Sequence, residues 1–233
     1  MNRFVIFLLL LTVCFAQPHE EQGLPFGVPV TRFSVSGRDY LFESDPEKKN
    51  PKWVLEYLTI NNLAKRANRA GIPFRIDPKV PVWAQTHAQD YTGTGYDRGH
   101  MSPADDNTHS KEAMEACFYM TNMAPQAPDV NRIVWLHFEE HVRRKLLSGD
   151  YLKCWVLSVP IYSSKSETLC DETWIPSMFG KSVLGVTKDG KFETTCWIVP
   201  NKQGLDQHKD YSVSEAEFER KAKMDIWPQV NER

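Results

Sequence analysis

A long amphipathic helix is the feature that most constrains how this chain can fold. Residues 131–147 have helical spacing and end at Ser148-Gly149, a common helix stop. At about 100° per residue, an apolar stripe lies within roughly 60° of Asn131, and Glu139 lies near its edge, at about 80°. The stripe consists of Val134, Trp135, Phe138, Val142 and Leu146. We therefore expect this helix to bury an asparagine, with a carboxylate at the margin of the buried face.

Asn131 on a buried face has two explanations. Burial of an unpartnered amide costs about 1–3 kcal/mol, so its side chain is either satisfied within the core or used as a ligand. The periodicity alone leaves both explanations open.

The opposite face of this helix carries a pattern with a different meaning. His137-Phe-Glu-Glu-His141 matches H-x-x-E-H, in which two histidines bind zinc and a glutamate is the general base of a protease. Arg143, Arg144 and Lys145 lie close by and disfavour a dication there. We therefore expect this face of the helix to be solvated, and a zinc metalloprotease that uses His137 and His141 is the remote alternative.

The remaining segments predict an α+β fold with a mixed or antiparallel sheet. Residues 154–159, 182–187 and 192–199 have strand character, and Asp189-Gly190 predicts a hairpin between the last two. The other predicted elements are strands within 31–42, a helix over 52–70, a short helix over 110–116, a strand over 118–121, a loop over 124–128 and a helix over 214–223. No internal repeat or linker is present, so residues 17–233 are predicted to form a single domain.

The charge balance limits the classes of function. Lys and Arg number 28 against 30 Asp and Glu, a formal net charge of −2. This balance argues against a protein that coats nucleic acid or a membrane through bulk positive charge, although a local basic site is compatible with it.

The N-terminus predicts export. Residues 4–16 are uncharged and apolar except for Thr12, and this run is too short to span a membrane, which needs about 20 residues. We interpret residues 1–16 as a signal peptide, with an uncleaved anchor as the alternative, and expect a secreted protein with no membrane association after cleavage. Mitochondrial targeting is disfavoured, because this N-terminus is apolar rather than amphipathic and rich in arginine.

The cysteines agree with export. Removal of the first 16 residues leaves Cys117, Cys154, Cys170 and Cys196, which predict two disulfides in any of three connectivities. No Asn-x-Ser/Thr acceptor occurs, so N-glycosylation is not expected.

A short polar motif suggests phosphate chemistry. Asp97-Arg98-Gly99-His100 follows the glycine-rich run at residues 91–95. Arginine offers fixed donors for a phosphate, a neutral imidazole can take a proton from water, and glycine allows close backbone approach.

The spacing of three motifs is more specific than any one of them. They are YDRGHMSPA at residues 96–104, FYMTNMAPQ at residues 118–126, and Asn131-x-x-x-Trp135-x-x-x-Glu139. Asn131 follows His100 by 31 residues. In order and spacing the chain resembles the DNA/RNA non-specific endonuclease family that includes endonuclease G, and weaker similarity covers most of the rest.

The resemblance implies a ββα-metal, or His-Me finger, active site. His100 would lie at the end of one strand, residues 118–121 near the second, and the Asn131 helix across both. Asn131 would be the direct protein ligand of a hydrated Mg²⁺, with Mn²⁺ as the alternative ion, and Glu139 would hold metal-bound water. His100 would be the general base, Arg98 would neutralise the phosphate, and Asn122 would support the site.

The family also implies substrates and products. A hydrolase using an external water needs no sugar 2′-hydroxyl, so DNA and RNA are both expected substrates, cut to 5′-phosphate and 3′-hydroxyl ends. Arg75 aligns weakly with a second phosphate-binding arginine and is equally compatible with a surface role. Oligomeric state is open, and a homodimer is compatible with the sequence.

Two departures and one further alternative accompany the resemblance. Arg132 replaces a glutamine common in the family, and Asp105-Asp106 is unexpected beside an anionic substrate. An inactive nuclease-like binding module is the alternative function, against which the retention of His100 and Asn131 argues.

Overall fold

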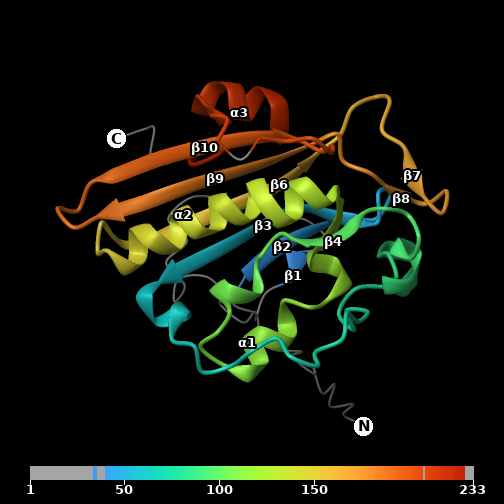
Figure 1. Ribbon diagram of the computed structural model, residues 1–233, viewed down its shortest axis with the longest axis horizontal. Coiled ribbons are helices and arrows are strands. Elements are labelled where there is room, and N and C mark those ends of the chain that lie inside the picture. The colour runs from blue at the N-terminus through green and yellow to red at the C-terminus, as the bar shows by residue number, and fades with distance from the viewer. Residues whose placement is uncertain (1–33, 36–39, 207, 229–233) are drawn as a thin grey trace, which may run out of the picture.

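A seven-stranded antiparallel sheet organises the protein, for which a computed structural model describes residues 34–35, 40–206 and 208–228 (Figure 1). The strand order is β1-β2-β3-β6-β9-β10-β11. The strands are β1 (Ser34–Val35), β2 (Tyr40–Asp45), β3 (Asn50–Thr59), β6 (Tyr151–Ile161), β9 (Met178–Thr187), β10 (Phe192–Pro200) and β11 (Ser212–Val213). The predicted hairpin is present, since Phe192 pairs with Val186 across the turn.

Helices cover both faces of the sheet. The helix α2 (Trp135–Leu147) packs on one face through the predicted stripe, and α3 (Glu215–Ala222) packs on the other through Phe218. In Figure 1, α3 lies above the sheet, whereas α1 (Lys111–Ala116) lies below it. Ser110 and Ser214 cap α1 and α3 by accepting hydrogen bonds from backbone amides, as Ser-initiated helices predict. The α+β class with an antiparallel sheet is thus confirmed.

The helix predicted over residues 52–70 is wrong. Its first half is β3, a central strand that pairs with both β2 and β6, and only Ile60–Leu63 forms a 3₁₀ turn. Trp53 faces one core and Val54 the other, so burial on both sides removes the alternation that identifies a strand. Pairing with two neighbours overrides the helix propensity of the Leu- and Lys-rich stretch.

The strand predicted over residues 118–121 is misplaced. The second strand of the site is β5 (Met123–Gln126), which pairs antiparallel with β4 (Asp97–His100) in a separate two-stranded sheet. Residues 124–128 were expected to be a loop because of Pro125, but a proline is tolerated in a strand paired on one side only. A second small sheet joins β7 (Thr168–Leu169) to β8 (Thr173–Trp174).

The prediction of two disulfides is also wrong. Cys117, Cys154, Cys170 and Cys196 are all free thiols, and all but Cys170 are buried. The thiol of Cys117 donates to the Met114 carbonyl at 3.0 Å, in the core beneath α2, whereas Cys196 lies in the core on the other side of the sheet. The cysteines are therefore distributed as small hydrophobic residues rather than as pairs.

The predicted signal peptide, residues 1–16, lies outside the described residues. Within the described part of the chain, no helix is long and apolar enough to cross a membrane.

The contact between β9 and the start of β6 leaves no space for a side chain at Gly185. A Cβ there would lie 2.4 Å from Cζ of Tyr151, a buried ring. We predict that Gly185→Ala lowers the unfolding free energy by about 1–3 kcal/mol, because the ring must move within a packed core. Urea unfolding measures this change.

Tyr151→Leu provides the matched background for this test. With the ring removed, the added methyl group meets less resistance, so Gly185→Ala should cost less in that background. An equal cost in both backgrounds would show that the ring contact is not the cause.

Candidate active site

The pair β4–β5 leaves no space for a side chain at Gly99. His100 pairs with Met123 and Gly99 with Ala124, and the side chain of Gln126 lies directly over Gly99. A Cβ at Gly99 would lie 2.0 Å from Oε1 of Gln126. Glycine in the Asp-Arg-Gly-His motif is therefore required by packing beneath the site.

A cavity of about 480 Å³ lies between β4 and the start of the long helix. Four residues predicted from the sequence line it: Arg98 and His100 from β4, and Asn131 and Glu139 from the helical segment. The walls also include Arg69, Phe74, Tyr96, Asp97, Asp105 and Arg132. Residues more than 30 positions apart in the chain thus meet at one opening, and the described strands and helix have the ββα order that the resemblance implies.

His100 lies in an aromatic environment. Its ring centroid is 5.0 Å from that of Phe118 and 5.6 Å from that of Phe74. Burial, reinforced by the positive charge of Arg69, lowers the pKa of His100 to about 3, so the imidazole is neutral at physiological pH. Its Nε2 has no hydrogen-bond partner among the described residues.

The backbone of His100 is tied to the helix. The indole Nε1 of Trp135 donates to the His100 carbonyl oxygen at 3.2 Å. This bond links the end of β4 to the buried stripe of α2.

Asn131 lies in a wide π-helical turn, Val130–Val134, that precedes α2. Its Nδ2 donates to Oδ2 of Asp97 at 2.9 Å, which leaves the carbonyl oxygen Oδ1 outside this hydrogen bond. Because the amide lies at the cavity with one end engaged, the turn presents an oxygen donor beside β4.

Asp97 is a site residue that the sequence reasoning missed. Arg132 donates to both of its oxygens, at 2.7 Å from Nε and 2.6 Å from Nη2. Partial burial opposes ionisation of the carboxyl, but the hydrogen bonds from Arg132 and Asn131 hold its pKa below the usual value. Asp97 could have been recognised as the first residue of the Asp-Arg-Gly-His motif. Its partner is Arg132, the residue that replaces a glutamine common in the family.

Glu139 is buried at the inner wall of the cavity. Burial raises the pKa of Glu139 to about 7, with Lys181 and Arg143 acting in the opposite direction and Asp106 in the same one. Arg143 approaches Oε2 of Glu139 at 3.9 Å and bonds Oδ1 of Asp106 at 3.0 Å. The unexpected Asp106 is thus a buried partner of an arginine, whereas Asp105 lines the cavity.

Arg98 is positioned by its neighbours. Its Nε and Nη2 donate to the Ala88 carbonyl at 3.0 and 2.5 Å. The guanidinium carbon lies 5.3 Å from the ring centroid of Phe74 and 5.5 Å from that of Tyr91. These contacts restrict the guanidinium group at the cavity wall.

Asn122 does not line the cavity but supports it from behind. Its side chain accepts from the Ser102 amide at 2.9 Å and donates to the Ser102 and Cys117 carbonyls at 2.8 Å each. The segment that follows His100 is therefore fixed by a fully buried amide.

Arg75 lies outside the cavity. Its Nη2 donates to the Glu115 carbonyl at 3.0 Å, and its guanidinium lies over the Tyr119 ring at 4.6 Å, so it joins α1 to the preceding segment. Arg69 lines the cavity instead. Sequence reasoning missed Arg69 because it placed this segment in a regular helix, where Arg69 had no distinguishing feature.

The zinc motif is separate from the cavity. His137 is exposed, and the ring of His141 packs edge-on against Trp197 at 5.3 Å. Among the residues that the structure describes, no group of three or more His, Cys, Asp or Glu side chains could hold a metal ion. The geometry of a two-histidine zinc site with a third protein ligand is therefore absent from this part of the chain.

Comparison with known proteins supports the family that the three sequence motifs indicate. Residues 24–233 match the model of the DNA/RNA non-specific endonuclease family. The chain is 31% identical to nuclease EXOG, mitochondrial, of Xenopus laevis over 92% of this chain and 64% of that protein. It is 27% identical to endonuclease G, mitochondrial, of Bos taurus over 76% of this chain and 62% of that protein.

A solved structure shares the fold. The chain matches a structure titled as the crystal structure of the EndoG/EndoGI complex, describing the mechanism of EndoG inhibition. The TM-score is 0.83 at 28% identity, and the match covers 88% of this chain and 90% of that one. The chain spans just under two thirds of the length of the two mitochondrial relatives.

These relatives contradict the prediction of secretion. Both are named as mitochondrial proteins, as is nuclease 1 of Schizosaccharomyces pombe, so the expected extracellular location was wrong. The prediction depended on the short apolar run at residues 4–16, and apolarity alone does not specify one destination.

The predicted family, in contrast, is confirmed by the match over residues 24–233 and by the shared fold. The chain belongs to the DNA/RNA non-specific endonuclease family.

Proposed function

We propose that this protein is a divalent-metal-dependent endonuclease that hydrolyses phosphodiester bonds of DNA and RNA. The supporting observation is that His100, Arg98, Asn131 and Glu139, from separate segments, line one cavity. A neutral base, a cation for phosphate and oxygen donors for a metal are the groups that such a hydrolysis needs.

The cavity suits a hard, hydrated cation. Asn131 offers an amide oxygen, and Glu139, Asp97 and Asp105 add carboxylates to the same walls. Mg²⁺ prefers oxygen ligands and retains several waters, so one direct protein ligand and nearby carboxylates are sufficient. Asn131 would hold Mg²⁺ or Mn²⁺, and Glu139 would hold its water. When bound, the ion would supply positive charge at the phosphate and at the departing 3′ oxygen.

The protein's own groups perform the proton transfer and the positioning. The His100 imidazole takes a proton from the water that attacks phosphorus, and the bond from phosphorus to the 3′ oxygen breaks. The departing 3′ oxygen takes a proton from solvent water, so the products carry 5′-phosphate and 3′-hydroxyl ends. Arg98 binds the phosphate, and Asn122 keeps the segment after His100 in place. Since the nucleophile is water, the 2′-hydroxyl is not required, and both DNA and RNA are substrates.

Replacement of His100 tests this assignment. We expect His100→Ala to reduce plasmid cleavage in Mg²⁺ by at least about 100-fold, because general-base catalysis is lost. His137→Ala is the matched control and should retain activity, and EDTA should abolish cleavage by the wild type. Wild-type turnover by His100→Ala would contradict the assignment. A wild type that binds nucleic acid but never cleaves it, with Mg²⁺ or Mn²⁺ present, would favour the inactive module.

The low pKa of His100 has a consequence for stability. The folded protein keeps this imidazole neutral down to a pH of about 3, whereas the unfolded chain takes up a proton below about 6.5. Stability contributed by the neutral ring is therefore present above about pH 6.5 and lost as the pH falls, by about 2 kcal/mol at pH 5.

We expect His100→Gln to lack the loss of stability that the wild type shows as the pH falls below about 6.5. Urea unfolding in EDTA at pH 7.5 and pH 5 should show a smaller drop in the unfolding free energy for the variant than for the wild type. Parallel pH dependence in the two proteins would contradict a neutral, buried His100.

Asp97 is expected to orient the ligand amide. Asp97→Ala frees Nδ2 of Asn131 and should raise the Mg²⁺ concentration for half-maximal cleavage by about tenfold or more. Arg132→Ala removes the other partner of Asp97 but keeps the bond to Asn131, so its effect on the Mg²⁺ requirement should be smaller. Equal Mg²⁺ requirements in wild type and Asp97→Ala would refute the orienting role.

A further inference from the structure

A second opening, which we name the basic groove, lies beside the active-site cavity. It has a volume of about 650 Å³ and runs between the segment at residues 63–69 and the C-terminal half of α2. Its cationic lining consists of Lys65, Arg69, Arg143 and Arg144. Lys65 and Arg144 have no role in the chemistry assigned above.

One wall of the basic groove is held in place by backbone hydrogen bonds. The amides of Arg66 and Ala67 donate to the Thr108 carbonyl at 2.8 and 2.9 Å, and the amide of Lys65 donates to the Thr108 hydroxyl at 3.1 Å. The 3₁₀ turn Ile60–Leu63 packs against α2 at the other end of this wall. The cationic side chains of this wall therefore project from an anchored backbone.

The groove is positively charged although the chain is not. Its lining has four cationic side chains and two carboxylates, Asp105 and Glu140, a net charge of +2, against −2 for the whole chain. Arg143 is mostly buried and bound to Asp106 at 3.0 Å. Arg144 is exposed and forms an ion pair with Glu140 at 3.8 Å, and Lys65 and Arg69 are exposed as well. Because Arg69 also lines the active-site cavity, Lys65 and Arg144 are the exposed cations that belong to the groove alone.

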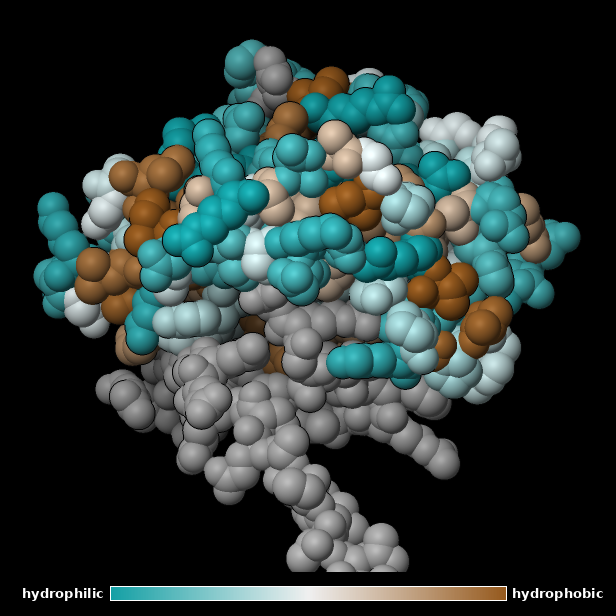
Figure 2. All heavy atoms as spheres, turned by 90° about the horizontal axis from the view of Figure 1, so that it is seen from below, coloured by the Kyte–Doolittle hydropathy of each residue, from teal (hydrophilic) through white to brown (hydrophobic). Residues whose placement is uncertain are grey.

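The basic groove is continuous with the cavity. Arg69 and Asp105 line both openings, so the groove and the cavity adjoin at these two residues. On the side of the molecule where α1 lies, hydrophilic side chains predominate and hydrophobic ones form small groups (Figure 2). This surface suits a charged strand better than an apolar partner.

We propose that the basic groove binds the phosphodiester backbone of the substrate strand beyond the scissile phosphate, with Lys65 and Arg144 contacting successive phosphates. This inference rests on the proposed function, because the strand is the one whose scissile phosphate lies at His100. Leu147, an exposed side chain in the same lining, offers an apolar contact for a base without selecting a sequence.

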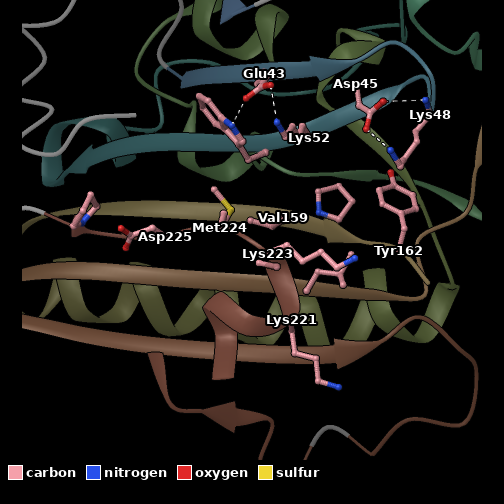
Figure 3. Close-up of a pocket in the computed structure, with 15 residues that line it drawn as sticks. Glu43, Asp45, Lys48, Lys52, Val159, Tyr162, Lys221, Lys223, Met224 and Asp225 are labelled. Atoms are coloured by element: carbon pink, nitrogen blue, oxygen red, sulfur yellow. Dashed lines mark hydrogen bonds and ion pairs between the residues drawn. The ribbon is translucent and has the colours of Figure 1, made fainter. Parts of the chain in front are cut away.

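The cavity on the other face of the sheet provides a contrast. It also contains several lysines, but Lys52 is paired with Glu43 at 2.9 Å and Lys48 with Asp45 at 2.6 Å, as the dashed lines in Figure 3 mark. Lys221 belongs to this cavity and comes from α3, across the sheet from the active site. It can therefore serve as a control position.

The test compares two double variants of the full chain. Lys65→Asn with Arg144→Gln removes two charges from the groove, and asparagine tolerates the positive φ of 51° at Lys65. Lys188→Gln with Lys221→Gln removes two charges elsewhere, since Lys188 is an exposed residue of the turn between β9 and β10. The probes are a labelled single strand of about 30 nucleotides and one of four nucleotides, long enough only for the cavity.

The groove variant should bind the long strand in EDTA about tenfold more weakly than wild type, with a salt slope smaller by about 1.4, from two lost phosphate contacts. In Mg²⁺ its kcat/KM should fall on the long strand and stay unchanged on the four-nucleotide strand. The control variant should match wild type in both assays.

Two outcomes would overturn the groove assignment. One is wild-type binding and salt slope in the groove variant, and the other is an equal loss of kcat/KM on both strands, which would assign Lys65 and Arg144 to the catalytic site itself. If the wild type cleaves neither strand, the proposed function fails, whereas a selective loss of long-strand binding in EDTA would still support the groove.

Discussion

Burial of the apolar stripe of α2 against the central sheet is the interaction on which the site depends. The stripe places Trp135 beneath β4, where its indole holds the His100 carbonyl. The same rotation of the helix directs Glu139 to the inner wall of the cavity and Asn131 to its mouth. If α2 presented a different face to the sheet, His100 would no longer lie at the same cavity as Asn131 and Glu139. The packing of the core and the geometry of the candidate site therefore depend on the same orientation of α2.

The site places charge where water has little access, and neighbouring groups compensate for it. Glu56 on β3 is buried and accepts a hydrogen bond from Ser102 at 2.7 Å, and Lys181 donates to Ser158 at 3.1 Å beneath Trp135. Burial raises the pKa of Glu56 well above its usual value, with Asp106 adding to the effect. A layer of buried ionisable groups thus lies between the sheet and the segment that follows β4, and each group depends on the others for polar contacts.

Elements with strong local signals could be predicted, whereas elements defined by distant partners could not. The stripe around Asn131, the Asp-Gly hairpin and the short helix over 110–116 have local signals, and the structure contains all of them. By contrast β3 is a strand because two remote strands flank it, and β5 is one because it meets β4. At the candidate site, motif spacing predicted His100 and Asn131, which line one cavity, whereas Asp97 and Arg69 are recognised only through neighbours that the fold supplies.

The free cysteines make this fold independent of the redox potential of its surroundings. Three of the thiols are enclosed in apolar cores, where burial raises the pKa of Cys117 to about 12 and of Cys196 to about 11, so little reactive thiolate forms. Hydrophobic packing and strand pairing, rather than cross-links, hold the two faces of the sheet together. The chain can therefore mature in a reducing compartment without an oxidase or a disulfide isomerase.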